Sequence, residues 1–163
     1  MQDVLGFDAE LWEILSVFLL SMIPVFELRG AIPLAAGLGM PFPESYILCV
    51  IGNMIPVPFI MLFARAILKW LKRFPKFERF ILWIENKVEK NKGRILKYSV
   101  FGLIVFVMLP LPGTGAWTGA LVATFLDMRL RTAIPCILIG VIISGLIMSG
   151  VSYGFLGFLD FIK

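Results

Sequence analysis

Charged residues divide the chain into long uncharged stretches, and the lengths of these stretches predict different elements. Residues 45–64 and 132–159 are each long enough to cross a bilayer as one helix at 1.5 Å per residue. Residues 14–26 and 30–43 are each too short to cross alone, and Glu27-Leu28-Arg29 separates them. The pattern therefore predicts two full spans and two short apolar arms.

The remaining uncharged stretch, residues 98–126, is long enough to cross, but its middle reads Leu109-Pro110-Leu111-Pro112-Gly113-Thr114-Gly115. Prolines remove backbone donors and clash with the preceding turn, while glycines allow backbone angles that other residues resist. A straight helix is therefore excluded. Two arrangements remain: a kinked span, or a re-entrant hairpin that dips to mid-membrane and returns to its own side.

The distribution of charge favours the hairpin. Basic residues collect on the cytoplasmic side of membrane proteins. If residues 98–126 turn back, Arg129 and Arg131 lie on the same side as the central basic block. Eleven of the fifteen Lys and Arg belong to that block: Arg65, Lys69, Lys72, Arg73, Lys76, Arg79, Lys87, Lys90, Lys92, Arg94 and Lys97. The block is expected in the cytoplasm, and the acidic N-terminal residues on the opposite side.

Composition strengthens the membrane interpretation and removes other classes. The chain is 60% hydrophobic and 16% charged, whereas soluble domains are about 45–50% apolar and about 25% charged. Disorder is excluded because a disordered chain needs low hydrophobicity. Histidine is absent, and the two cysteines, Cys49 and Cys136, lie in apolar runs. A zinc site, a disulfide framework and nucleic-acid binding are therefore not expected.

The two halves of the chain share one plan, so we expect an internal repeat in a single membrane domain. Residues 11–73 and 98–161 each contain a short arm, a Pro-containing break, a small-residue arm and a long span. Because each half crosses the membrane once, the second is inverted relative to the first. Inverted repeats with broken helices at the midplane are a recurring transporter design. The predicted fold is thus an all-α membrane protein of two re-entrant hairpins, each followed by a span.

Residues 74–97 form the linker between the halves, and their pattern predicts an amphipathic helix on the cytoplasmic surface. Its apolar face would anchor the linker, with lipid sensing as the alternative role. The apolar positions at helical spacing are Phe77, Phe80, Ile81, Ile84 and Val88.

Glu27 and Arg29 are the acid and base placed at the break between the first two arms. Charges at membrane depth are costly and are usually retained for a use. The alternative is a structural ion pair that locks the tip of the hairpin. On a regular helix, residues two apart point to different sides, so such a pair requires the break.

Several uncharged residues join these two as candidates. Breaks at proline expose amide and carbonyl groups that bind ions, and polar or aromatic residues beside them are able to line a pathway or only to pack. Two stripes of small residues at every fourth position are interpreted as helix packing: Ala31, Ala35 and Gly39, and Gly115, Gly119 and Ala123. The candidate substrate- or ion-binding residues are Glu27, Arg29, Gly30, Pro33, Asn53, Pro110, Pro112, Gly113, Thr114, Gly115 and Trp117. No catalytic set, phosphate loop or metal spacing is present, so neither an enzyme nor a cofactor is expected.

The two breaks also carry a resemblance. Phe26-Glu27-Leu28-Arg29-Gly30-Ala31-Ile32-Pro33 and the segment from Leu109 to Trp117 resemble the two signature segments of the small multidrug export family of prokaryotic membrane proteins. The plan of two hairpins, each followed by a span, is similar to the DedA superfamily, which implies movement of lipid phosphates such as undecaprenyl phosphate. That superfamily carries arginines in the second hairpin, whereas residues 98–126 are uncharged here.

These observations favour a small ion-coupled transporter of a prokaryotic cytoplasmic membrane, driven by a proton or sodium gradient. It would export or flip an amphipathic or lipid-linked substrate, with Glu27 as the coupling group and Arg29 holding an anionic head or tuning Glu27. The alternatives are a DedA-like lipid phosphate translocase and a structural or assembly factor. Gly150 and Gly154 offer a close-contact face, so a homodimer is expected.

Overall fold

Helices separated by short breaks make up the part of the chain that the computed structural model describes, residues 9–71, 92–111 and 113–162. No strand occurs within those residues, which agrees with the all-α prediction. The helices are α1 (Ala9–Met22), α2 (Glu27–Gly37), α3 (Phe42–Met54), α4 (Pro56–Leu71), α6 (Lys92–Met108), α7 (Ala116–Phe125) and α8 (Leu130–Ile162).

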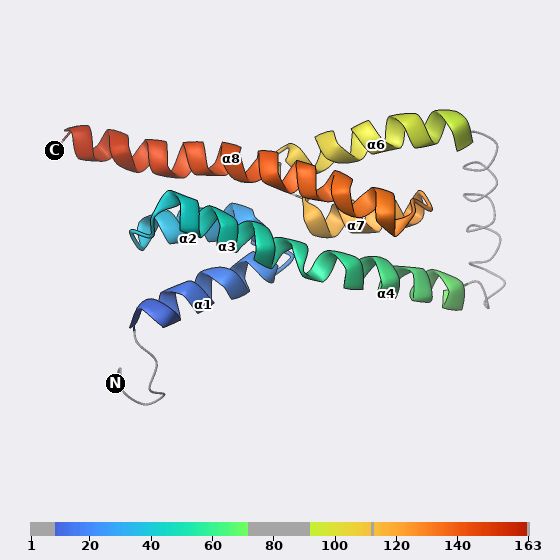
Figure 1. Ribbon diagram of the computed structural model, residues 1–163, viewed down its shortest axis with the longest axis horizontal. Helices are drawn as coiled ribbons and strands as arrows, with labels where there is room; N and C mark the ends of the chain where they lie inside the picture. Colours follow the sequence, from blue (N-terminus) through green and yellow to red (C-terminus); the bar gives the residue numbers. More distant parts are fainter. Residues whose placement is uncertain (1–8, 72–91, 112, 163) are drawn as a thin grey trace.

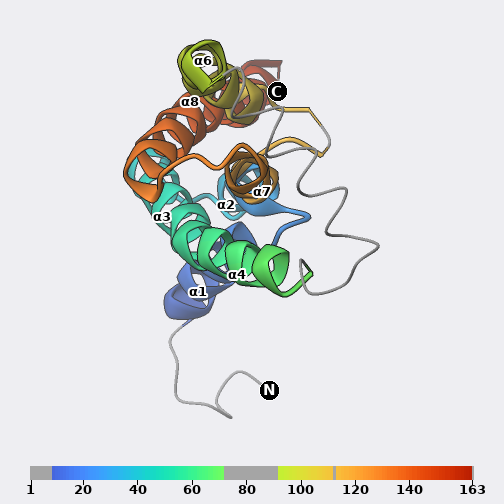
Figure 2. The same ribbon diagram turned by 90° about the vertical axis from the view of Figure 1, so that its right-hand side faces the viewer.

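Two long helical segments and several shorter helices build the described part of the molecule (Figure 1). The consecutive helices α3 and α4 together run along nearly the whole length of the molecule, and α8 runs along it in the opposite direction. Helices α1 and α2 occupy one half of this length, while α6 and α7 occupy the other. The view along the length shows α2 and α7 near the centre, with the other helices in an arc above, to the left of and below them (Figure 2).

Two helical segments are long and apolar enough to cross a bilayer. Phe42–Trp70 has a mean hydropathy of 2.3, and Leu130–Gly154 has a mean hydropathy of 2.4. Only 28% and 39% of their most apolar stretches are buried inside the protein, so most of this apolar surface faces outward. A soluble domain rarely exposes so much contiguous apolar surface, and a lipid environment accounts for it. The chain is therefore a helical membrane protein.

The first of these segments contains an interruption that the sequence analysis missed. Residues 45–64 were expected to form a single helix, but α3 ends at Met54 and α4 begins at Pro56. The physical reason lies in Pro56 and Pro58, which cannot donate the backbone hydrogen bonds of a regular helix. The predicted span is present, because Phe42–Trp70 is one apolar helical segment, but its regular hydrogen bonding is interrupted at Ile55. The two helices continue in the same general direction (Figure 1).

The two proline-containing breaks join the short helices. In the first half, the chain leaves helical structure between Met22 and Glu27, so the Glu27-Leu28-Arg29 segment forms the first turn of α2 and not the break itself. In the second half, residues 109–115 separate α6 from α7. The second break thus lies where the prolines and glycines predict it.

Small residues let the helices of the second half approach closely. Val107 of α6 is buried against two glycines, Gly119 of α7 and Gly140 of α8. A Cβ added at Gly119 would lie 2.5 Å from Val107 Cγ2, and one added at Gly140 would lie 2.6 Å from Val107 Cβ. The packing interpretation of the small-residue stripe therefore holds for Gly119, because a larger residue there would push the helices apart.

Specific hydrogen bonds hold the long helices together near their ends. At one end, the Tyr153 hydroxyl lies 2.6 Å from Ser45 Oγ and donates to the Met40 carbonyl at 2.9 Å. At the other end, Arg65 Nη2 of α4 donates to the carbonyl of Met128, in the turn between α7 and α8. These contacts join α3 and α4 to the second half of the chain.

Most of the predicted amphipathic linker lies outside the described residues, and α6 already begins at Lys92 within its last part. Gly150 and Gly154 lie on α8 with open space above both, since a Cβ built at either residue would meet nothing within 4 Å. Their face is thus available to a neighbour.

Candidate functional site

The two breaks meet in the middle of the molecule. Helix α2 begins at Glu27 and helix α7 begins at Ala116, and they extend in opposite directions from this meeting point (Figures 1 and 2). The free backbone N–H groups at the start of a helix and the free carbonyls at its end need partners. In a membrane, water does not supply them. The contacts below provide these partners.

Arg29 satisfies the carbonyl end of α6. Its Nη2 donates to the Leu109 carbonyl at 2.8 Å and to Thr114 Oγ1 at 3.0 Å, and lies 3.4 Å from the Val107 carbonyl. Its Nη1 donates to the Leu111 carbonyl. A cation at the end of a helix also interacts favourably with the helix dipole. The guanidinium therefore forms its hydrogen bonds with groups of the second break.

Glu27 satisfies the opposite kind of helix end. Its side chain is 4% exposed, and Oε1 accepts a hydrogen bond from the backbone N–H of Trp117 at 3.1 Å. Trp117 is the second residue of α7, so the carboxylate lies at the positive end of that helix dipole. Glu27 itself has a φ of 50°, a left-handed conformation that costs of the order of 1–3 kcal/mol and clusters at functional sites.

Gly115 makes room for that carboxylate. It precedes α7 with a φ of 142°, which favours glycine. A Cβ at this position would overlap Glu27 Oε2 and would lie 2.7 Å from its Cδ. Glycine is thus favoured at position 115 for two reasons: the backbone φ is positive, and the Glu27 carboxylate leaves no space for a Cβ.

Trp117 closes the contact from the second side. Its indole Nε1 donates to the carbonyl of Met22 at 3.1 Å. Met22 is the last residue of α1, so this bond supplies a partner for a free carbonyl at the end of that helix. Of the two roles open to Trp117 in the sequence, the structure therefore gives it a capping hydrogen bond between the breaks.

Glu27 and Arg29 direct their hydrogen bonds to the second break and not to each other. The acid caps the amino end of α7, and the base caps the carboxyl end of α6. The two charges also interact electrostatically with each other, so the structural ion pair considered in the sequence analysis stays an alternative beside these contacts between the halves. Chemically, the site offers one enclosed carboxylate, which suits a proton or a cation.

The other predicted residues lie at different places. Thr114 belongs to the site, because its hydroxyl accepts from Arg29 and lies 2.7 Å from the Leu109 carbonyl. Gly30 packs against Phe26, since a Cβ there would lie 3.0 Å from Phe26 Cβ. Asn53 is fully buried, and its side-chain amide forms no hydrogen bond. Pro33, Pro110 and Gly113 are exposed, and Pro112 falls in a gap between the described residues.

Sequence reasoning missed the acceptors of the site, which are backbone carbonyls. The carbonyls of Leu109 and Leu111 receive Arg29, and that of Met22 receives Trp117. A signal was present, since Pro110 and Pro112 cannot continue the helix and a break leaves carbonyls without partners. Their pairing across the molecule depends on tertiary structure.

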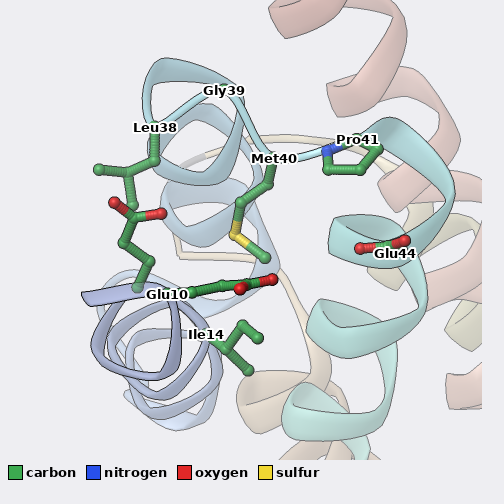
Figure 3. A pocket seen from close by; sticks show the side chains of 8 residues that line it. Glu10, Ile14, Leu38, Gly39, Met40, Pro41 and Glu44 are labelled. Carbon is green, nitrogen blue, oxygen red and sulfur yellow. The ribbon is translucent and has the colours of Figure 1, made fainter. Parts of the chain in front are cut away.

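A second feature lies at the end of the molecule that carries the connection between α2 and α3. A cavity of about 180 Å³ lies there, and Figure 3 shows the Met40 side chain between the helices that carry Ile14 and Glu44. Three carboxylates are among its lining residues, which are Glu10, Glu13, Ile14, Leu38, Gly39, Met40, Pro41 and Glu44. Within the described residues, no group of three or more His, Cys, Asp or Glu is arranged to hold a metal ion.

Comparisons with known proteins give one match. The family described as "Putative small multi-drug export protein" matches residues 27–147, which includes both breaks and α8 as far as Ile147. No curated protein and no solved structure was found to match the chain. The matched region covers most of the chain and contains all the residues of the contact between the breaks except Met22. The chain therefore belongs to the small multidrug export family, a family named for membrane export.

Proposed function

We propose that the protein exports small amphipathic cations in exchange for protons at the site where the two breaks meet. The observation that carries this proposal is the unequal commitment of the two charges. Arg29 uses both terminal nitrogens on partners from the second break, while Glu27 contacts the backbone N–H groups of Ala116 and Trp117 at the start of α7. Arginine remains protonated in proteins, so Glu27 is the group of the pair whose charge is able to change.

Proton exchange at Glu27 would work through the start of α7. An ionised carboxylate is held by the Trp117 N–H and by the helix dipole. Protonation removes the charge and weakens both interactions, which releases the contact between the halves. A cationic substrate restores the negative charge when it displaces the proton. Sodium is the competing coupling ion, and the transport assay below distinguishes the two by the gradient that drives movement.

The proposed architecture is that of two re-entrant hairpins, α1–α2 and α6–α7, in an inverted repeat. Alternating access then arises when one repeat rocks against the other around a fixed midplane site. The half-length extent of these four helices supports this proposal (Figure 1).

Orientation in the proposed prokaryotic cytoplasmic membrane follows from charge. Arg129, Arg131 and the basic residues 74–97 would face the cytoplasm, and the N-terminus the outside. We expect a cysteine at Asp127 to be labelled from the cytoplasm and one at Glu44 from outside, because both positions are exposed. Met128 is fully buried and is unsuitable for labelling. Labelling of position 127 from outside would contradict the re-entrant second hairpin.

Self-association into a homodimer is proposed on the open face of α8. Gly150 and Gly154 are exposed and have free space above them, which allows close approach of a second helix. Native mass spectrometry in lipid should show a dimer, and Gly150→Leu should weaken it. A strictly monomeric protein would contradict this.

The alternative of a lipid phosphate translocase requires Arg29 to bind an anion. Its hydrogen bonds to the second break argue against this role, since an anion would have to displace the Leu109 and Leu111 carbonyls. A structural or assembly factor would keep its activity after loss of the Glu27 charge. The two alternatives therefore predict different results for the variants Glu27→Gln and Arg29→Lys.

Transport in proteoliposomes tests the proposal. Glu27→Gln keeps the acceptor for the Trp117 N–H but cannot exchange a proton, so it should fold like wild type and lose proton-driven movement of a lipophilic cation. Ser144→Ala, which changes a buried side chain elsewhere, is the control and should retain transport. Full proton-driven transport by Glu27→Gln would overturn the role of Glu27. Uptake of undecaprenyl phosphate that is lost in Arg29→Lys would favour the translocase.

A further inference from the structure

Asn53 is a buried side chain whose hydrogen-bonding groups have no partner in the protein. It is 0% exposed, and neither Oδ1 nor Nδ2 forms a hydrogen bond. Most buried polar groups in folded proteins have a partner, and each exception calls for an explanation such as a bound molecule. An unpartnered amide lowers stability, and among the unpartnered buried side chains of the described residues only Asn53 lacks a partner at both a donor and an acceptor atom, which makes it the candidate ligand group.

The backbone around Asn53 is short of donors. Asn53 lies in the last turn of α3, directly before the interruption at Ile55. In a regular helix the carbonyls of Gly52 and Met54 would accept from residues 56 and 58. Both positions are proline, which has no N–H. Two carbonyl acceptors therefore lose their helical donors beside the Asn53 amide.

Ser21 of α1 adds a further acceptor. A Cβ on Gly52 would overlap Ser21 Oγ, so the hydroxyl lies directly against this part of α3. Ser21 Oγ donates its proton to the Phe18 carbonyl at 2.6 Å, which leaves its lone pairs as acceptors. Ser21 also precedes Met22, the residue that receives the Trp117 indole. The cluster is therefore next to the contact between the breaks.

The same interruption is open to the bilayer on its other side. Ile51, Ile55 and Phe59 are exposed apolar residues of the α3–α4 segment. Because successive residues of a helix are about 100° apart, the buried Asn53 side chain faces away from Ile51 and Ile55. The segment thus combines a lipid-facing apolar side with an enclosed set of acceptors on its protein side.

We propose that Asn53, the carbonyls of Gly52 and Met54, and Ser21 bind the head of an amphipathic amine that carries several N–H donors. A primary ammonium group offers three N–H donors to this acceptor-rich set, whereas a trimethylammonium group offers none. The inference rests on the proposed export of amphipathic cations and names the chemical class of the substrate. Asn53 selects for N–H donors.

Calorimetric binding to the purified full-length protein tests this with two probes, octylamine and octyltrimethylammonium. Wild type should bind octylamine about tenfold more tightly, because several hydrogen bonds are made only by the primary amine. Asn53→Leu should bring the two affinities close together while thermal stability stays equal or rises. Ser144→Ala is the matched control, because it removes a different buried polar group without a partner, the Ser144 hydroxyl. It should leave the tenfold preference unchanged.

Equal affinities in wild type, or a preference that survives in Asn53→Leu, would overturn the proposal. Failure of both Asn53→Leu and Asn53→Val to fold would also contradict it, because the amide would then have an essential structural role. Proton coupling is measured separately with Glu27→Gln. A protein that prefers octylamine through Asn53 but shows no proton-driven transport would contradict the proposed function and leave this site standing.

Discussion

The first and second breaks solve the same problem with different chemistry. The first break is short and is followed directly by two charged side chains, Glu27 and Arg29. The second break is longer, carries no charge, and contributes backbone groups and glycines. Each of these two charges contacts a helix end of opposite polarity at the second break. Side chains on one side therefore match bare backbone on the other.

This difference shows why the two halves are not interchangeable despite their common plan. Charges on both breaks would place like groups near each other, and bare backbone on both would leave helix ends without partners at membrane depth. The observed arrangement, with charged side chains in one half and uncharged backbone groups in the other, avoids both costs. It also places both charged side chains of the contact, Glu27 and Arg29, in one half of the chain.

Replacement of Arg29 should break this complementarity most severely. Arg29→Met leaves the Leu109 and Leu111 carbonyls and the Thr114 hydroxyl without their donor. Because charged partners are lost at a partly buried site, we expect the free energy of unfolding to fall by about 3–5 kcal/mol. Thermal or SDS-induced unfolding in detergent measures it. Arg29→Lys should retain part of the stability, and a fully stable Arg29→Met would show that water replaces the guanidinium.

A methyl group at Gly115 tests the space on the second break. Gly115→Ala adds overlap with the Glu27 carboxylate to an unfavourable φ, and we expect a loss of about 3 kcal/mol. Gly113→Ala is the matched control, because it also has a positive φ of 82° but free space for a Cβ. It should cost about 1 kcal/mol. Equal losses in the two variants would contradict the contact with Glu27.

The hydrogen bond from Trp117 to Met22 should have a smaller effect. Trp117→Phe keeps an aromatic ring but removes the indole N–H. A neutral hydrogen bond contributes about 1 kcal/mol net, so the melting temperature should fall by a few degrees. An unchanged melting temperature would mean that the Met22 carbonyl finds another donor.

The smallest effect is expected for the coupling between the two charges. If Glu27 and Arg29 formed only a mutual ion pair, removal of both would restore most of the stability lost in Arg29→Met. Because each bonds to the second break, Glu27→Gln added to Arg29→Met should restore less than about 1 kcal/mol. A double-mutant cycle measures this, and substantial restoration would support the mutual pair.

Much of the fold could be predicted from local sequence. The all-helical membrane character, the span from residue 132 and the break at Pro110 and Pro112 follow from hydropathy and from the missing proline N–H groups. The interruption at Ile55 was also visible in Pro56 and Pro58, but the length of the apolar stretch outweighed it. Uncharged sequence predicts that a segment lies in lipid and does not predict that it is one regular helix.

The candidate site was predictable in its residues but not in its contacts. Glu27 and Arg29 stand out because charge is rare in membrane segments, and Gly115 and Trp117 stand out because they adjoin the second break. Their partners are backbone carbonyls and N–H groups, which every residue has, so composition does not identify them. Only the meeting of the breaks shows that Arg29 donates to Leu109 and Leu111 rather than remaining free.

The contacts between the breaks also determine when the protein can be completed during synthesis. Arg29 and Leu111 are 82 residues apart, and Glu27 and Trp117 are 90 residues apart. At about 5–20 residues per second, the ribosome needs roughly 5–20 seconds to make the second break after the first. During this interval Glu27 and Arg29 lack the hydrogen-bond partners that the second break supplies in the folded protein. The nascent first half therefore depends on an aqueous or protein-lined insertion environment until residue 117 has emerged.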